Sequence, residues 1–507
     1  MRGTRTLLHS PAAQLLRRRS VASAAIFANP RHFLSTISSE PLHVCIVGSG
    51  PAGFYAAKYL LKDAAPRALH VDMLEALPTP FGLVRAGVAP DHPEVKSVMG
   101  DFEKVAADDR FRFLGNVRVG DDVRLTDLRA HYHVIVLAYG AAGDRELGIP
   151  GEHLDGVLSA RAFVNWYNGH PHFRDLRVDL SGDTAVVFGQ GNVAVDCARI
   201  LTKSVDELAT TDISQHALDA LRSSNIKKVY LVGRRGSAQA AFTMKELREL
   251  TKLDGVACVV DPVDLARSRN ESSLQEISEQ RATKRMNELL TKSSEAFGNE
   301  RAAKVVQIKF LSAPTEIVAS PTHPERVGSV RVEKTQLQGE AHRQRTVGTG
   351  EFDELSAGLV LRSIGYKSQP LDDAPFDAQR NVLANRDGRL VNASGEPVVG
   401  LYCTGWVKRG PTGIIGANIV DARETVASIL EDIASGKTLE PTTAGDSLEA
   451  IRQLVWAKTP GKQLVSWDDY KRLDREETKR GEAVGKPREK VTSVDEMLRI
   501  IAGSSSW

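Results

Sequence analysis

The sequence predicts an α/β protein in which one nucleotide-binding domain is inserted into another. A strand, a glycine-rich turn and a helix follow one another at residues 43–61 and again at residues 184–201. This is the order of a Rossmann-like unit. A further strand, Leu401–Cys403, runs into another glycine-rich turn and completes the first unit after the second has ended. The 507 residues also exceed what a single compact core usually holds.

We therefore expect the first domain at residues 41–143 and 371–507, and the inserted domain at residues 144–370. Hydrophobic residues make up 42% of the chain and charged residues 26%, which excludes a disordered or fibrous protein. A formal net charge of +2 excludes a uniformly basic nucleic-acid-binding protein. No apolar run approaches the roughly 20 residues that span a bilayer, so we expect a soluble chain or one peripheral to a membrane.

The first 39 residues differ from the rest in charge. They contain six arginines and no acidic residue. An Arg-rich, acid-free amphipathic leader is typical of an organelle transit peptide, and Arg31–Ser35 resembles a mitochondrial processing site. We therefore expect residues 1–34 to be a mitochondrial transit peptide and the mature protein to lie in the matrix. The alternative is a disordered basic tail that contacts nucleic acid or anionic lipid.

The first glycine-rich turn contains Gly48, Gly50 and Gly53 in G-x-G-x-x-G spacing. The first glycine permits the tight turn, the second lets backbone N–H groups approach a pyrophosphate, and the third lets the helix pack against its strand. The next strand, residues 69–74, ends at Glu75. A carboxylate there binds ribose hydroxyls and repels a 2′-phosphate, which fits the ADP half of FAD or NAD.

The second turn, Gly189–Ala194, has alanine in place of the third glycine, a variant that the fingerprint permits. Its next strand, residues 228–232, leads to Arg234 and Arg235 with no acid. Because guanidinium groups match the geometry of phosphate, this site is expected to select NADP(H). Residues 204–226 lengthen the unit and are interpreted as an insertion. The alternative for the arginine pair is a solvated turn.

The remaining segments predict further elements. Strand–glycine junctions at residues 133–140 and 358–365 are typical of crossings between the two nucleotide domains of flavoprotein reductases. Residues 262–304 have a helical period, and residues 316–352 alternate strands with polar turns. In the tail, two serines that are each followed three residues later by an acid predict helix N-caps: Ser466 with Asp469, and Ser493 with Glu496.

Four cysteines are scattered through the chain without a CxxC pair, at Cys45, Cys197, Cys258 and Cys403. This spacing excludes a disulfide framework and the redox dithiol of a disulfide reductase, and it shows no zinc or iron–sulfur ligand pattern. We expect all four to be small core residues and predict no metal site.

Three longer stretches resemble the mitochondrial NADPH:adrenodoxin (ferredoxin) oxidoreductase family. They are Leu77–Pro93, Phe242–Leu250 and Gly405–Ile415, and the likeness extends over about residues 42–500. The resemblance implies an FAD flavoprotein that takes hydride from NADPH and passes single electrons to a [2Fe–2S] ferredoxin. Related disulfide reductases place an Asp where this chain has Trp406, and this difference agrees with the adrenodoxin-reductase-like group. We expect a monomer that forms transient complexes.

The resemblance also implies which residues contact the cofactors. Those for FAD are Gly48, Gly50, Pro51, Ala52, Gly53, Glu75, Leu83, Val119, Trp406, Gly413, Ile414 and Ile415. Those for NADP(H) are Gln190, Gly191, Asn192, Val193, Arg234, Arg235, Glu246 and Gly413.

Hydride transfer between two cofactor rings needs no protein nucleophile or obligatory base, so we assign no catalytic side chain. Two residues stay open. His92 lies either near the flavin and the acceptor or in an ordinary turn, and Asp196 either tunes the flavin or relays a proton, or caps local backbone.

An acidic ferredoxin requires a basic docking face. Candidate residues occupy two helices: Lys245 and Arg248 on one, and Arg281, Lys284 and Arg285 on the other. The alternative is two solvated helix faces. Two rival functions also stay open, an NADPH-dependent flavin monooxygenase or oxidase, and a redox-sensing NADP/FAD-binding protein.

Overall fold

The structure is a computed structural model and describes residues 41–64, 69–442 and 445–503. Residues Leu42–Trp507 form one compact unit. The predicted transit peptide, residues 1–34, lies outside the described residues. Among the helices of the described part, none is long and apolar enough to cross a membrane.

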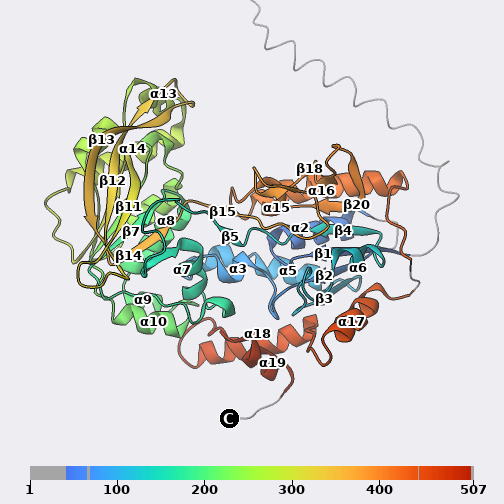
Figure 1. The fold of residues 1–507 in the computed structure, drawn as a ribbon. Coiled ribbons are helices and arrows are strands. Elements are labelled where there is room, and N and C mark those ends of the chain that lie inside the picture. The colour runs from blue at the N-terminus through green and yellow to red at the C-terminus, as the bar shows by residue number, and fades with distance from the viewer. Residues whose placement is uncertain (1–40, 65–68, 443–444, 504–507) are drawn as a thin grey trace, which may run out of the picture. The chain divides into compact units, whose positions relative to one another are not determined.

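The first of two large sheets contains strands from both ends of the chain (Figure 1). In their order across the sheet, the strands are β18 (Asn385–Arg386), β19 (Arg389–Val391), β20 (Pro397–Cys403), β4 (Val134–Leu137), β1 (Leu42–Val47), β2 (Leu69–Leu74) and β3 (Phe111–Leu114). β20 joins β4 in parallel, whereas β18 and β19 extend the edge antiparallel. The predicted discontinuity is therefore present in the sheet itself.

The second large sheet is parallel throughout. Its strands, in order, are β6 (Val157–Ser159), β14 (Leu359–Arg362), β7 (Thr184–Phe188), β8 (Lys228–Val232), β10 (Lys304–Lys309) and β9 (Val256–Val260). The predicted class, α/β with two Rossmann-like sheets, is confirmed. The boundaries at 143/144 and 370/371 stay a prediction.

Alternation along β1 shows why the first sheet is buried on both faces. Val44 and Ile46 belong to the hydrophobic cluster on one face, and Cys45 and Val47 to the cluster on the other. Successive side chains of a strand point to opposite faces, so a strand covered on both sides is apolar throughout. The helices of this half are α2 (Pro51–Asp63), α3 (Leu83–Ala86), α4 (Pro93–Lys96), α5 (Met99–Ala106), α6 (Leu125–Arg129), α15 (Trp406–Arg409) and α16 (Ala417–Ala434).

The helices of the second half include the predicted insertion and the predicted helical segment. They are α7 (Ala160–Tyr167), η1 (Pro171–Phe173), α8 (Asn192–Thr202), α9 (Val205–Leu208), α10 (Gln215–Arg222), η2 (Ser237–Gln239), α11 (Met244–Leu250), α12 (Pro262–Arg267), α13 (Glu271–Glu279) and α14 (Arg281–Glu295). An antiparallel three-stranded sheet follows, of β11 (Ser312–Ala319), β12 (Val327–Gln338) and β13 (Arg345–Ser356), which confirms the strands expected there.

A short antiparallel ribbon joins the segments that cross between the two large sheets. It consists of β5 (Gly143–Asp144) and β15 (Tyr366–Lys367), directly after the two predicted strand–glycine junctions. A further small hairpin is formed by β16 (Phe376–Asp377) and β17 (Val382–Leu383).

The chain ends in α17 (Ser447–Lys458), α18 (Trp467–Glu482) and α19 (Val494–Ile501). The predicted capping box at Ser466 is confirmed, since its hydroxyl and the Asp469 carboxylate satisfy each other's backbone N–H groups. A helix also begins after Ser493, but no side chain caps it. Glu496 instead pairs with Arg480 at 2.7 Å, so this cap prediction is wrong in its bonding.

Candidate nucleotide-binding sites

The first glycine turn joins β1 to α2 and is shaped by backbone contacts. Gly48 has a φ of +104°, and a Cβ on it would lie 2.7 Å from the carbonyl oxygen of Ala138. A Cβ on Gly53 would lie 2.1 Å from the carbonyl oxygen of Gly48. A Cβ on Gly50, by contrast, would meet no atom within 4 Å. Gly48 and Gly53 therefore close the turn, whereas Gly50 leaves open space at the start of α2.

That space is part of a cavity of about 470 Å³, which we call the Gly48 cavity. Nine of the residues implied for FAD line it: Gly48, Gly50, Pro51, Ala52, Glu75, Leu83, Trp406, Ile414 and Ile415. Gly53 lies behind the turn, Val119 follows the lining residue Arg118, and Gly413 precedes the lining residue Ile414. The structure thus brings together residues that are more than 300 positions apart in the sequence.

The start of α2 favours an anion in the Gly48 cavity. No side chain caps the N-terminus of α2, a helix of 13 residues, so its first N–H groups remain available. Arg85, Arg118 and Arg161 also line the cavity, but each is paired with an acid outside the lining, which is Glu477, Asp121 and Asp144 respectively. The three arginines were not predicted, because their approach depends on contacts between distant segments. A diphosphate such as that of FAD fits this environment.

Glu75 ends β2 beside the turn, as predicted. One carboxylate oxygen accepts hydrogen bonds from the Ser49 amide at 3.1 Å and from its hydroxyl at 2.6 Å. The other accepts from the Leu77 amide at 3.0 Å. Since a carboxylate can accept about four hydrogen bonds, Glu75 is held in place and can still accept from a ribose hydroxyl.

The opposite wall of the cavity is the turn that leads into α16. No side chain caps this 18-residue helix, which begins beside Ile414 and Ile415. Trp406 packs against Tyr366 of the β5–β15 ribbon, with ring centroids 5.5 Å apart. The carboxylate of Asp421 accepts from the Gly405 amide and pairs with Lys408 at 2.8 Å. These contacts fix Trp406 and its neighbouring residues at the wall of the cavity.

The second glycine turn repeats the first. Gly189 has a φ of +134°, and a Cβ on it would lie 2.1 Å from the carbonyl oxygen of Ser363. A Cβ on Gly191 would meet no atom within 4 Å, and no side chain caps α8. Asn192 accepts a hydrogen bond from the Thr243 amide at 2.8 Å and so ties the turn to the start of α11.

Arg234 and Arg235 follow β8, the parallel neighbour of β7, so they lie at the edge of the sheet where the glycine turn is. Both side chains are exposed, and neither forms an ion pair with a described residue. The side chain of Gln190 lies so close to Gly233 that a Cβ on this glycine would be 2.2 Å from the Gln190 amide group. Two unpaired guanidinium groups beside an uncapped helix fit a nucleotide that carries an additional phosphate.

Glu246, His92 and Asp196 were considered separately in the sequence, and the structure places them in one cluster around Arg199. Arg199 is 1% exposed and pairs with Asp196 at 2.7 Å and with Glu246 at 3.1 Å. His92 lies 2.7 Å from the carboxylate of Glu249 and 4.0 Å from that of Glu246. The cluster joins the loop before α4 to α8 and α11.

Burial controls the protonation of these acids. It raises the pKa of Asp196, although the charge of Arg199 opposes the change. It also raises the pKa of Glu246, with the nearby Asp196 acting in the same direction. The carboxylate of Asp196 pairs with Arg199, so a simple backbone cap does not describe its contacts, and the proton-relay role stays a prediction.

His92, Glu246 and Glu249 also place three possible metal-ligating atoms within 4.8 Å of one another. Their oxygens and nitrogens already pair with each other and with Arg199. Because this guanidinium provides the positive charge that a metal ion would supply, we interpret the group as an ion-pair network.

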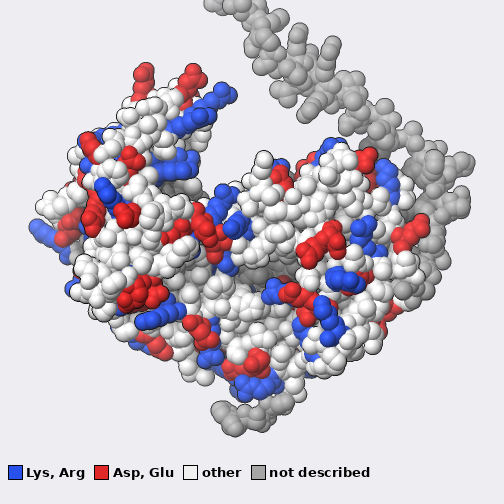
Figure 2. All heavy atoms as spheres, in the orientation of Figure 1, with Lys and Arg blue, Asp and Glu red and all other residues white. Residues whose placement is uncertain are grey.

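The five predicted docking residues lie on α11 and α14, which pack together. Arg248, Arg281, Lys284 and Arg285 are exposed and pair with no described acid. Lys245 differs, since it is held at 2.6 Å by Glu94 and at 3.7 Å by Glu249. Figure 2 shows several Lys and Arg side chains beside the region of α13 and α14, interrupted by acidic ones.

All four cysteines are buried and unpaired, in β1, α8, β9 and β20, which confirms their place in the core. Burial raises the pKa of each thiol. Thiols of raised pKa are poor nucleophiles, which agrees with the structural role expected for these four residues.

Comparisons with known proteins agree with this geometry. Residues 42–260 match the family model described as pyridine nucleotide-disulphide oxidoreductase. The mitochondrial NADPH:adrenodoxin oxidoreductase of Homo sapiens is 46% identical over 93% of this chain and 94% of its own, and that of Arabidopsis thaliana is 45% identical over 93% and 97%. NADPH-ferredoxin reductase FprA of Mycobacterium tuberculosis is 42% identical over 92% of this chain and 100% of its own. The structure of FprA in complex with NADPH superimposes with a TM-score of 0.84.

Proposed function

This chain belongs to the NADPH:adrenodoxin oxidoreductase family, and on that premise we propose that it passes electrons from NADPH through FAD to a [2Fe–2S] ferredoxin. The proposal rests on the two glycine-rich turns at the starts of α2 and α8, which we call cradles. The carboxylate of Glu75 lies beside the first cradle, and the unpaired guanidinium groups of Arg234 and Arg235 follow the strand beside the second. One cradle suits the ADP half of FAD and the other suits NADP(H). A single-cofactor protein would need only one.

Bound FAD supplies the chemistry, which is hydride acceptance and one-electron release. The side chains position the two nucleotides. Gly50 and Gly191 leave room for the diphosphates, Glu75 receives the ribose, and Arg234 and Arg235 receive the 2′-phosphate. No side chain is assigned to attack the substrate, because hydride transfer depends on the distance and orientation of the two rings.

The remaining implied contacts complete each site. Leu83, Val119, Trp406 and the stretch Gly413–Ile415 would surround FAD beyond its diphosphate. Glu246 and Gly413 would contact NADP(H). These assignments are supported by the way the Gly48 cavity gathers the FAD set and by the link between Asn192 and the start of α11.

For the electron acceptor we propose docking on α11 and α14. The support is the exposed and unpaired state of Arg248, Arg281, Lys284 and Arg285. An acidic ferredoxin would be attracted to them and would associate faster at low ionic strength. Lys245 contributes less to this face, because its ammonium group is already neutralised by Glu94 and Glu249.

We propose that the protein acts in mitochondria, in the matrix, after removal of residues 1–34. The names of the animal and plant relatives support the organelle, and the acid-free leader supports import. We also propose that it acts as a monomer, with an FAD domain at residues 41–143 and 371–507 and an NADP domain at residues 144–370.

The test mixes the purified holoprotein with NADPH and a mitochondrial-type [2Fe–2S] ferredoxin and follows the reduction of cytochrome c. We expect the rate to depend on ferredoxin and to saturate with it. Rapid NADPH oxidation by O₂ that is unchanged by ferredoxin would instead support a flavin oxidase or monooxygenase and contradict the proposal. Flavin reduction slower than minutes would support a redox sensor.

A further inference from the structure

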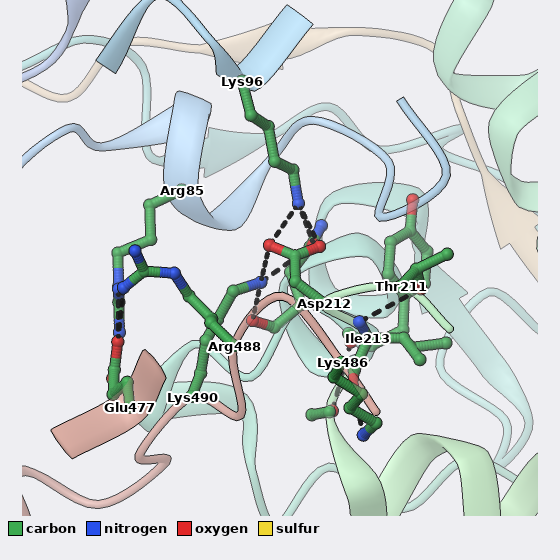
Figure 3. A network of polar contacts seen from close by, with 12 residues as sticks. Arg85, Lys96, Thr211, Asp212, Ile213, Glu477, Lys486, Arg488 and Lys490 are labelled. Carbon is green, nitrogen blue, oxygen red and sulfur yellow. Dashed lines mark hydrogen bonds and ion pairs between the residues drawn. The ribbon is translucent and has the colours of Figure 1, made fainter. Parts of the chain in front are cut away.

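None of the residues implied for FAD or NADP(H) lies in the insertion at residues 204–226. The insertion nevertheless contains a buried carboxylate that pairs with two lysines. Asp212 lies in the turn between α9 and α10 and is 8% exposed. The ammonium group of Lys96, at the end of α4, donates to its two oxygens at 2.6 and 2.8 Å. The ammonium group of Lys490 lies 3.0 Å from it. Figure 3 shows both lysines directed at this one carboxylate.

Lys490 belongs to residues 486–491, which lie in the connection between α18 and α19 and which we call the strap. The strap also forms hydrogen bonds with backbone groups of the second half of the chain. Lys490 donates to the backbone oxygen of Asn168 at 3.1 Å, and Lys486 donates to the backbone oxygen of Ile213 at 3.0 Å. Its Glu489 accepts from the Gln215 amide at 3.1 Å. Four of its contacts, including the ion pair of Lys490 with Asp212, therefore reach the second half of the molecule.

The strap is equally well fixed to the first half. Glu477 of α18 is completely buried, and its carboxylate accepts from Arg85 at 2.5 and 2.9 Å, from Arg488 at 3.0 Å and from the Val491 amide at 2.9 Å. A Cβ on Gly481 would lie 2.4 Å from the Cα of Arg488, so the strap packs directly on the helix. The strap is therefore fixed to α3 and α18.

The charges of Asp212 and its two lysines oppose their separation. Burial alone would raise the pKa of Asp212, but the charges of Lys490 and Lys96 lower it far below its usual value, so the carboxylate stays ionised. Burial also lowers the pKa of Lys490 to about 7, with Asp212 opposing and Lys96 and Arg85 reinforcing the change. Separation of Asp212 from its lysines would leave buried charges without a partner, which is strongly unfavourable.

The chain itself crosses between the two large sheets through a short connection, and the pair of Arg199 with Asp91 is a second side-chain contact between the halves. The β5–β15 ribbon has only two residues in each strand, and Gly140 and Gly365 beside it have φ values of +76° and +98°. Such a ribbon can act as a hinge. The contacts of Asp212 lie elsewhere and resist rotation about it.

We propose that the 204–226 insertion and the strap form a charged latch, centred on Asp212, that holds the NADP domain in the orientation needed for hydride transfer. Asp212 is thus a positioning residue that touches neither nucleotide site. The kinetic part of this inference rests on the proposed function, whereas its structural part does not.

The test uses the full-length holoprotein with spin labels at two exposed positions, Gln275→Cys on α13 and Ala427→Cys on α16. The native cysteines are buried and will not compete for label. In this background we compare Asp212→Asn, Lys490→Met and the double variant. Asp206→Asn on the insertion and Lys479→Met on α18, the helix before the strap, are the controls, since both side chains are exposed and pair with no described residue.

We expect a narrow label-to-label distance distribution in the parent and the controls, and a broad one in both single variants. Anaerobic stopped-flow reduction of the flavin by NADPH should slow about tenfold in these variants, while FAD content is unchanged. The double variant removes the uncompensated charge, so it should regain thermal stability but keep the broad distribution and the slow reduction.

A narrow distribution in the double variant, or reduction as fast as in the controls, would overturn the latch. Recovery of stability, distribution and rate together would show that Asp212 serves folding alone. A failure of ferredoxin reduction in the parent protein would contradict the proposed function and leave the distance measurement valid. The two hypotheses can therefore fail separately.

Discussion

The turns at Gly48 and Gly189 have the same backbone design and different chemical surroundings. In both, the first glycine has a positive φ and lies against the backbone that follows a neighbouring strand, Ala138 in one case and Ser363 in the other. In both, the second glycine faces open space at an uncapped helix. The backbone design therefore suits a diphosphate in both turns, and the proposed selectivity depends on the residue that ends the next strand.

The two helices that follow differ in the contacts that supplement their apolar packing. On α2, Phe54 stacks in an aromatic cluster with Phe81 and Phe102, at centroid distances of 5.4 and 4.9 Å. On α8, Arg199 makes a network of ion pairs that reaches Asp91 in the other half of the chain. Both helices also pack apolar side chains into the core of their own half, so the ion pairs of α8 are an addition to that packing. The predictions below compare the two sides wherever the chain offers a counterpart.

The largest effect is expected from the substitution Gly53→Ala. The added methyl group would lie 2.1 Å from a backbone oxygen that cannot move without opening the turn. We expect the purified protein to contain less than about a tenth of the parent's FAD, measured from its visible absorbance. Ala194→Gly, the reciprocal change in the second turn, should alter NADPH affinity by less than about threefold. A Gly53→Ala protein with full FAD content would contradict the proposed geometry.

The next effect tests the choice between nucleotides. Arg234→Gln combined with Arg235→Gln removes two exposed guanidinium groups that have no other partner among the described residues. Since a charge-assisted bond to phosphate contributes about 1.5–3 kcal/mol, the KM for NADPH should rise roughly 100-fold, with the KM for NADH unchanged. Ferricyanide reduction with each nucleotide measures both values. Arg267→Gln, an exposed arginine on α12, is the control, and an equal rise for NADPH and NADH would exclude a 2′-phosphate site.

A smaller effect separates nucleotide binding from acceptor docking. Arg248→Glu and Arg285→Glu reverse exposed charges outside both cradles. Each should slow ferredoxin-dependent cytochrome c reduction about tenfold at low salt and spare NADPH–ferricyanide activity. Arg475→Glu, on the exposed face of α18, is the control. Loss of both activities to the same degree would argue against a docking role.

These features differ in how far the sequence could reveal them. The glycine turns, Glu75 and the Arg234–Arg235 pair depend on local spacing, so they could be predicted. The cluster around Arg199 could not, because it joins Asp91 to residues more than 100 positions away, and the same is true of Asp212 and Lys490.

Local patterns also have limits in the direction of overprediction. Ser493 has the sequence of a capping box, yet its acid pairs with Arg480 instead. There a tertiary ion pair competes successfully with the local role, and one sequence alone does not show which partner wins. The pair of Lys245 with Glu94 could not be predicted either, since 151 positions separate the two residues, and the docking role of Lys245 stays a prediction.

The smallest predicted effect concerns pH and tests the charge anchor of α8. Burial alone would raise the pKa of Asp91, but its hydrogen bonds to Arg199 at 2.8 and 3.1 Å lower the pKa to about 2 from an ordinary value of 3.8. Between these values the unfolded chain binds more protons than the folded one, so this stabilisation is complete above about pH 5 and is lost as the pH falls. The difference amounts to about 1 kcal/mol between about pH 4.5 and pH 3.

Asp91→Asn should therefore lower the Tm at neutral pH, and the Tm of the variant should fall less than that of the parent as the pH is lowered. Calorimetry of the holoprotein measures both. The variant's neutral-pH loss measures the anchor together with the cost of leaving Arg199 with one acid fewer. Phe54→Leu in the aromatic cluster of α2 is the reference, because it lowers stability without introducing or removing a titrating group. If Asp91→Asn and Phe54→Leu kept the same acid slope, the ion pairs of Arg199 would add no pH-dependent anchor to α8, and the contrast between the two helices would have to be abandoned.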